Sequence, residues 1–579
     1  MKRFAIVALV ILLGCEQEKN PEIVDNEIID LRKRIAMCPP VLDDQEWYNS
    51  ENKAPLLDGL DVLDFPITTN NELAQDYFNQ GLILSYAFNH AEAARSFYYA
   101  SKLDPNCAMA YWGYAYVLGP NFNAGMYPRN FQPAFEASQK AKSLITEETP
   151  QIERELILAL TERYVQNPPE DRSSLDVTYS EAMKKVFEKF PNDADVGALY
   201  AESVMDLHPW DIWDAKGEPK PWTADLLAVF DKVFEIDPQH PGAHHLYIHS
   251  VEASSTPELG LVSADLYDKD LVPGAGHLVH MPAHIYIRTG DYHKGTLSNL
   301  RSVKVDSSYL SNCYAQGTYP LTLYPHNYHF MSATATLEGD ADLAIFAAQK
   351  VADHANRQLM KEPGWGTIQH YYTIPYYVKV KFGKWDEIVE MSNEDSSLAY
   401  PEAIRHYARG MAFSGLGEES SAVLELKKLK EYAQDEKFKE VTIWDINTTY
   451  ELLQIAIRVL EAEILAKKGQ YDQSVQLLQE AVAIEDALNY QEPPDWFFSV
   501  RHELGSVLTA SKRYDEAIEA YNEDLKKLPR NGWALSGLKS VYSITGDTEK
   551  EQSINEQFEA AWAYANVDLD GSEIKIASN

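Results

Sequence analysis

Histidines cluster in one stretch of this 579-residue chain, at spacings that could do chemistry. Ten of the sixteen histidines lie between residues 240 and 329. Most of them recur every three or four residues, which places them on one face of a helix. The three stripes are His245, His249 and Glu252; His277, His280 and His284; and His326 and His329. Three neighbouring helices that each carry such a stripe indicate a site for a metal ion.

A shared metal ion is the chemistry that these stripes favour. Packed helices lie about 8–10 Å apart, so imidazoles from adjacent helices can reach one ion at about 2.0–2.1 Å. Imidazole with carboxylate and without thiolate suits Zn, Cu(II) or Fe, and the number of candidate ligands permits two ions. The alternatives are a hydrogen-bonded polar groove and a groove that binds anions when protonated. Zinc-protease, phosphate-loop and dinucleotide motifs are absent from the sequence, so no nucleotide cofactor is expected.

Two residues on the stripes are candidates for catalysis. Glu252 would serve as a metal ligand or general base. Arg288 lies four residues beyond His284 and would hold an anionic substrate or a partner carboxylate, unless it is simply a charge at a helix end. Three other histidines fall off the stripes and are expected in turns or in packing: His240, His244 and His293.

The elements that position these residues follow a repeat. From about residue 74 the chain alternates helical segments with Gly- or Pro-containing turns, without a sustained strand pattern. One copy of the repeat is Gly81, Ala93, Phe97, Ala100 and Pro105, and another is Gly505, Tyr514, Ala517, Tyr521 and Pro529. These small, aromatic and breaker positions resemble those of the 34-residue tetratricopeptide repeat.

The resemblance implies an all-α fold, a right-handed solenoid of about nine or ten helical hairpins with loop insertions over residues 71–565. In this family the first helix of each hairpin lines a concave groove that binds a peptide or protein partner. The repeat register places the three stripes on the groove, and His370 at the matching position of the next repeat. The candidate metal ligands are therefore His245, His249, Glu252, His277, His280, His284, His326, His329 and His370.

Three insertions interrupt the repeats. They span residues 119–128, 208–222 and 307–325 and are rich in turn-forming and aromatic residues, including Trp210. Lids over the groove, platforms for a sugar ring, and loops that cap apolar helix ends are the interpretations open for them.

The first fifteen residues resemble a bacterial lipoprotein signal. Lys2 and Arg3 precede an apolar run of about ten residues, too short to span a bilayer, which ends in Leu-Leu-Gly before Cys15. The resemblance implies removal of residues 1–14 and lipidation of Cys15, which would anchor the chain in the bacterial cell envelope, at the periplasmic face of the outer membrane or the cell surface. Residues 15–70 are expected to form a polar linker and residues 566–579 a polar tail.

Net charge limits the class of partner, and the cysteine content limits the number of disulfides. The chain has 88 Asp and Glu against 51 Lys and Arg, a formal net charge of −37, which repels phosphate backbones and argues against a nucleic-acid partner. Cys38, Cys107 and Cys313 allow one disulfide, which the sequence does not select.

Two functions fit these observations. In the first, the chain is an anchored scaffold whose groove captures an envelope protein or peptide, within a nutrient or polysaccharide uptake or degradation system, and the metal is a structural or recognition element. In the second, the groove holds a metal-dependent enzyme, a hydrolase or an oxidase.

Overall fold

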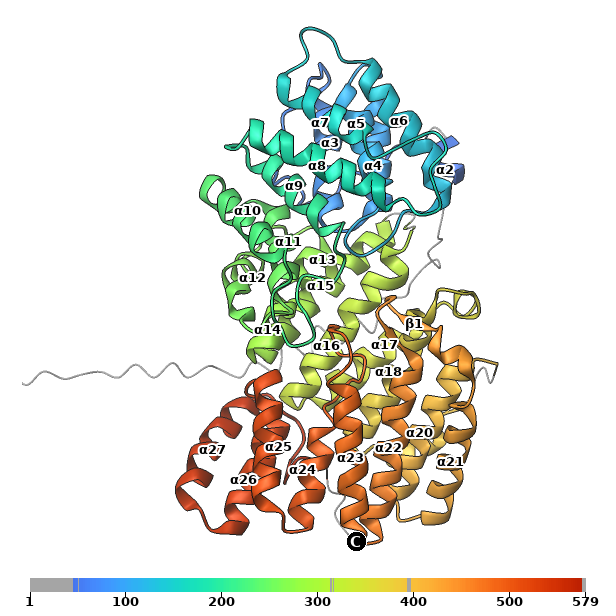
Figure 1. Cartoon of the computed structure of the whole chain (residues 1–579), viewed down its shortest axis with the longest axis vertical. Coiled ribbons are helices and arrows are strands. Elements are labelled where there is room, and N and C mark those ends of the chain that lie inside the picture. The colour runs from blue at the N-terminus through green and yellow to red at the C-terminus, as the bar shows by residue number, and fades with distance from the viewer. Residues whose placement is uncertain (1–44, 50–51, 313–314, 316, 393–396, 575–579) are drawn as a thin grey trace, which may run out of the picture. The chain divides into compact units, whose positions relative to one another are not determined.

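The computed structural model describes residues 45–49, 52–312, 315, 317–392 and 397–574, and nearly all of their regular structure is helical (Figure 1). Two short antiparallel strands, β1 (Thr442–Ile443) and β2 (Asn447–Thr448), form the one sheet in these ranges. The all-α prediction is therefore confirmed. The signal segment with Cys15, as well as Cys38 and Cys313, lies outside the described residues, and Cys107 is a buried free thiol.

Successive helices pair as antiparallel hairpins. The short helix α2 (Gln45–Asn49) and the 3-10 turn η1 (Pro128–Asn130) accompany the first four pairs. These pairs are α3 (Glu72–Tyr86) with α4 (His90–Leu103), α5 (Ala108–Val117) with α6 (Phe131–Ser143), α7 (Gln151–Thr161) with α8 (Ser173–Lys189), and α9 (Ala194–Met205) with α10 (Thr223–Ile236).

The next three hairpins carry most of the clustered histidines. They are α11 (Pro241–Val251) with α12 (Leu261–Asp268), the broken helix α13 (Gly276–His280) and α14 (Pro282–Thr289) with α15 (Tyr292–Asn312), and α16 (Tyr324–Glu338) with α17 (Ala341–His354). Three short turns accompany them: η2 (Pro257–Gly260) within the first hairpin, the π-helical η3 (Tyr319–Leu323) before α16, and η4 (Leu359–Lys361) after α17.

Five hairpins complete the solenoid, with η5 (Glu436–Lys439) between the second and the third. They are α18 (Gly366–Lys381) with α19 (Trp385–Glu390), α20 (Ala399–Gly415) with α21 (Glu419–Tyr432), α22 (Thr449–Lys467) with α23 (Tyr471–Glu485), α24 (Arg501–Ala510) with α25 (Tyr514–Lys527), and α26 (Gly532–Thr545) with α27 (Thr548–Ala561). The described residues thus form twelve hairpins, more than the nine or ten predicted, because the stretch from 130 to 240 folds as hairpins although its repeat pattern is weak.

Small residues let neighbouring helices approach as the repeat pattern predicts. A Cβ atom added to Gly113 would lie 2.3 Å from the Phe97 ring, and one added to Gly505 would lie 2.3 Å from Tyr521. These aromatic rings therefore occupy the space that glycine leaves free between packed helices, across adjacent hairpins for Gly113 and within one hairpin for Gly505. This packing is of the tetratricopeptide type, and it keeps the hairpins in a continuous stack.

Both segments that flank the predicted solenoid pack against it. In the predicted linker, Leu60 and Phe65 are buried, and the backbone N–H of Leu57 donates to Gln80 at 2.7 Å. In the predicted tail, Ser572 is buried and donates to the carbonyl of His502 at 2.7 Å. The described parts of the polar linker and the polar tail therefore pack against the folded body. No helix in the described ranges is long and apolar enough to cross a bilayer.

Candidate metal centre

Six of the predicted histidines meet inside the solenoid. They come from α11, α13, α14 and α16, and we call them the histidine centre: His245, His249, His277, His280, His284 and His326. Each is at most 8% exposed. The stripes are therefore enclosed, because loops and aromatic side chains cover them.

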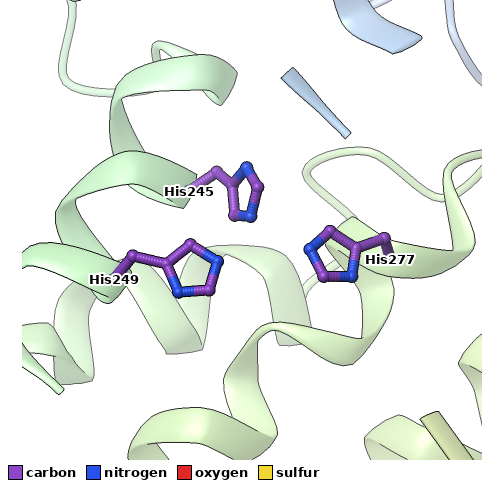
Figure 2. Close-up of side chains that lie close together, drawn as sticks. All are labelled: His245, His249 and His277. Carbon is purple, nitrogen blue, oxygen red and sulfur yellow. The ribbon is translucent and has the colours of Figure 1, made fainter. Parts of the chain in front are cut away.

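The histidine centre contains two sets of three potential ligands. Figure 2 shows the first set, His245 and His249 on α11 facing His277 on α13. The second set is His280, His284 and His326. In each set the ligating atoms lie within 4.8 Å of one another. Because the ligands of one tetrahedral ion are about 3.3 Å apart, the side chains of each set must draw together by up to about 1.5 Å to bind an ion.

Hydrogen bonds fix the tautomer of the two histidines on α11. The Nδ1 atom of His245 donates to the carbonyl oxygen of Tyr86, and Nδ1 of His249 donates to Oε1 of Glu252 at 2.6 Å. Both acceptors lack a hydrogen, so the proton of each neutral ring must be on Nδ1. The Nε2 atoms of both rings are buried without a hydrogen-bond partner among the described residues. Each therefore holds a free lone pair directed into the centre.

The second set brings two such lone pairs together. His284 Nδ1 donates to Oε2 of Glu252 at 2.5 Å, and His280 Nδ1 donates to Oδ1 of Asn299 at 2.6 Å. The Asn299 amide group donates to the carbonyl of Gly295, which identifies Oδ1 as the acceptor. The Nε2 atoms of His280 and His284 then face each other at 2.9 Å, each without a proton.

Two facing lone pairs at this distance repel each other unless a positive charge lies beside both. Two nitrogens bound at right angles to one ion at about 2.05 Å, as in square-planar or octahedral coordination, are about 2.9 Å apart, and those of a tetrahedral ion are about 3.3 Å apart. The spacing of His280 and His284 therefore matches that of two adjacent ligands of a metal ion.

Glu252 orients one histidine of each set. It is fully buried, and the hydroxyl oxygen of Tyr490 lies 3.3 Å from its Oε2 atom. Burial alone would raise the pKa of Glu252, but the neighbouring His284 and His249 outweigh it and hold the pKa below its ordinary value. Because both carboxylate oxygens accept from imidazole Nδ1 atoms, Glu252 is a positioning residue for two ligands rather than a free general base. His249, Glu252 and His284 form a third group of potential ligands, and their atoms lie close together because of these hydrogen bonds.

Burial favours the neutral form of most imidazoles in the centre. Desolvation, followed by the neighbouring imidazoles, lowers the pKa of His245, His277, His280 and His326 well below the ordinary value. Neutral imidazole is the form that binds metal ions, whereas a protonated, anion-binding groove would require the opposite shift. The interior thus favours the metal hypothesis over the anion hypothesis.

All three insertions contribute to the cover of the histidine centre. Phe122 and Trp210 lie 5.7 and 5.5 Å from the ring of His249, and the Tyr319 hydroxyl accepts from the backbone N–H of His277 at 3.0 Å. Among the interpretations open for the insertions, the structure supports that of lids.

Two further predicted ligands lie apart from the centre. The rings of His329 and His370 are 6.2 Å from each other, and neither residue belongs to a ligating set of three among the described residues. His370 instead pairs with the Tyr400 hydroxyl at 2.9 Å. The off-stripe histidines have protein partners, as expected of packing residues: His240 with Asp195, His244 with Ser263, and His293 with Glu338.

Arg288 lines a cavity of about 690 Å³ next to the histidine centre. Its guanidinium lies 5.5 Å from the centre of the Tyr490 ring and donates to the carbonyl of Ser254 at 3.3 Å. Neither interaction involves a histidine of the centre. Arg288 is thus placed to meet a ligand in the cavity.

Several residues of the site gave no signal in the sequence. Phe88 packs over His245, His249 and His277 with ring centroids 4.6, 5.8 and 5.7 Å away, and it has a φ of 54°. A left-handed backbone is strained for phenylalanine, and the neighbouring sequence does not predict it. Asn299 and Tyr490 were also missed, because their contacts depend on segments distant in the chain.

Comparison with known proteins gives only distant likeness. No family model and no curated protein matches the chain. Among solved structures, the human IFIT1 dimer with m7Gppp-AAAA aligns at 13% identity, covering 94% of this chain and all of that one, with a TM-score of 0.31. The APC/C hetero-tetramer Cut9-Hcn1 aligns at 14% identity, with 88% and 77% covered and a TM-score of 0.28. The P58(IPK) TPR domain aligns at 14% identity, with 85% and 98% covered and a TM-score of 0.20. These low scores carry no inference about the ligands of this chain.

Proposed function

We propose that this chain is a lipid-anchored repeat protein of a bacterial cell envelope that binds transition-metal ions in its histidine centre and acts as a binding scaffold. The facing Nε2 atoms of His280 and His284 carry the metal part of this proposal. Their tautomers are determined by Glu252 and Asn299, so the two lone pairs have no protein group to neutralise their repulsion.

The donor set favours Zn, Cu(II) or Fe. Two sets of three imidazoles give up to two ions per chain, with Glu252 behind one ligand of each. A bound ion would supply a positive charge and a Lewis acid in a water-poor interior.

The scaffold part rests on the solenoid and on the signal predicted at the N-terminus. Stacked hairpins offer extended surfaces for protein or peptide partners, and lipidation of Cys15 would hold these surfaces at a membrane. A place in a nutrient or polysaccharide uptake system agrees with both features.

Elemental analysis of the purified full-length chain, prepared without chelator, tests the metal proposal. We expect one or two equivalents of a transition metal, and their loss in the double variant His249→Ala/His280→Ala. His293→Ala is the matched control, since His293 lies on the same hairpin as His280 but pairs with Glu338. A chain that stays metal-free after incubation with Zn, Cu and Fe would refute the proposal, provided that circular dichroism shows it folded.

A second candidate function is a metal-dependent hydrolase or oxidase. One observation favours it: Tyr490 links Glu252 to the cavity next to the histidine centre, so a ligand there would lie close to the metal ligands. Turnover that is lost in the double variant, while partner binding persists, would support the enzyme over the scaffold.

A further inference from the structure

The cavity beside the histidine centre lies where η2, α14, α25 and the loop after α23 meet. Its volume of about 690 Å³ is in the range of small-molecule sites. The loop that follows α23 supplies much of its wall, including Tyr490, Gln491 and Glu492, and Arg288 enters from α14.

Three polar groups that line this cavity have a buried atom without a hydrogen-bond partner among the described residues. They are Nε of Arg288, Nε2 of Gln491 and Oε2 of Glu492. Gln491 and Glu492 are only 7% and 5% exposed. Such atoms are costly to bury unless something satisfies them, so together they indicate a ligand.

The protein contacts of these groups define what they offer. The Gln491 carbonyl accepts from the backbone N–H of Glu492 at 3.2 Å, which leaves its amide NH₂ as a donor. Glu492 Oε1 accepts from the Tyr490 hydroxyl at 2.8 Å, which leaves Oε2 free. Burial, only partly offset by Arg288, raises the pKa of Glu492 to about 8, so near neutral pH this carboxyl can both donate and accept.

Charge and donor type exclude two classes of ligand. A cation would leave the donors of Arg288 and Gln491 unsatisfied, because neither atom can accept a hydrogen bond. An anion would satisfy the donors, but more carboxyl groups than cationic side chains line the cavity, Asp495 and Asp524 among them. A neutral ligand rich in hydroxyl groups meets both conditions, since each hydroxyl donates and accepts.

We propose that this cavity binds a small neutral saccharide, either free or as the end of a longer glycan. Arg288 and Gln491 donate to ring or hydroxyl oxygens, and Glu492 exchanges hydrogen bonds with a neighbouring hydroxyl. Tyr490, Trp496 and Phe497 in the wall provide apolar faces for the sugar ring. The site does not depend on metal, but it fits a scaffold in a polysaccharide uptake system and lies one hydrogen bond from Glu252.

Calorimetric titration of the full-length chain with a defined panel tests this proposal. The probes are glucose, galactose, mannose, maltose and cellobiose, with glucuronate and succinate as anionic controls. We expect at least one neutral sugar to bind, and a preference for a disaccharide over its monosaccharide would indicate a glycan end. Binding of the anions alone, or of no sugar, would overturn the proposal.

Substitutions of residues that line the cavity test whether the sugar binds there. Gln491→Leu and Arg288→Lys each remove a free donor, and we expect each to weaken sugar binding about tenfold or more. Lys526→Gln is the matched control, because Lys526 lines the same cavity but pairs with Glu523 at the surface. An equal loss in all three variants would also overturn the proposal, and an unchanged thermal unfolding midpoint shows that each variant is folded.

The metal and sugar proposals can fail separately. Titration is done on the metal-loaded and on the chelator-treated chain, while metal content is measured without sugar. Sugar binding by a chain that never holds metal would refute only the proposed metal centre, and metal without sugar binding would refute only this inference.

Discussion

The histidine centre and the His502 site of the C-terminal repeats are both fully buried, yet they differ in what their ring nitrogens meet. His502 has two partners: Nδ1 accepts from Lys381 at 2.9 Å, and Nε2 donates to Asp524 at 2.9 Å. In the centre, by contrast, Nε2 of His245 and His249 and both nitrogens of His277 have no hydrogen-bond partner among the described residues.

This difference shows that burial does not distinguish a structural histidine from a candidate ligand. His502 completes an ion-pair network that holds α18, α24 and α25 together. Four histidines of the centre, His245, His249, His280 and His284, are held through Nδ1 and direct Nε2 inward, which is how protein ligands of metal ions are usually arranged. The comparison therefore predicts opposite responses to mutation, acid and metal.

The largest effect is expected from His502→Ala. The substitution leaves Lys381 and Asp524 buried without their common partner, so the free energy of unfolding should fall by about 3–5 kcal/mol. Urea denaturation of the full-length chain measures this change. Metal content per folded chain should stay the same, and a loss of metal in this variant would contradict the distinction between the two sites.

Metal should stabilise the chain through the histidine centre. With free zinc at about 100 times its Kd, the unfolding free energy should rise by about 2.7 kcal/mol per site. His280→Ala should abolish this gain at the second set. In the metal-free chain it should cost less than His502→Ala, because the lost hydrogen bond to Asn299 is offset by relief of the repulsion between the facing Nε2 atoms. Thermal unfolding with and without zinc provides the measurement, and a metal-independent loss of several kcal/mol would make His280 a structural residue.

Acid should weaken the His502 site. Burial raises the pKa of Asp524, but His502 and the hydrogen bonds outweigh it and lower the pKa from 3.8 to about 2. A carboxylate with a lowered pKa contributes stability above its unfolded-state value, and this contribution disappears as the pH falls from about 4 through 2. It amounts to about 2 kcal/mol. The unfolding free energy of Asp524→Asn should lack this part of the acid dependence, and identical pH curves for variant and parent would refute the assignment.

The smallest effect is expected from Glu252→Gln. Glutamine keeps one acceptor oxygen, so one of the two histidines loses its orienting partner, and zinc affinity should fall about tenfold, or about 1.4 kcal/mol. Competition with a chromophoric chelator measures the affinity. Glu258→Gln, on the nearby η2 turn, is the control. An unchanged affinity would mean that Glu252 does not orient a ligand.

Local pattern predicted the helices and the candidate ligands. Spacings of three and four residues place side chains on one helical face whatever the rest of the chain does, so the stripes on α11, α13, α14 and α16 were readable directly. The glycine and aromatic positions predicted the hairpins for the same reason. The pattern failed for His329 and His370, because a shared face on successive helices does not ensure that side chains from different helices converge.

The sequence by itself therefore determined the repeated hairpins and the histidines that share a helical face, since both follow from the 3.6-residue period of the helix. Tertiary structure alone decided which nitrogens are free, which carboxylate orients them and that the insertions bury the site. The bonds of His245 to Tyr86 and of Glu252 to Tyr490 join residues 159 and 238 positions apart. No local periodicity encodes such contacts, because they depend on how distant hairpins pack.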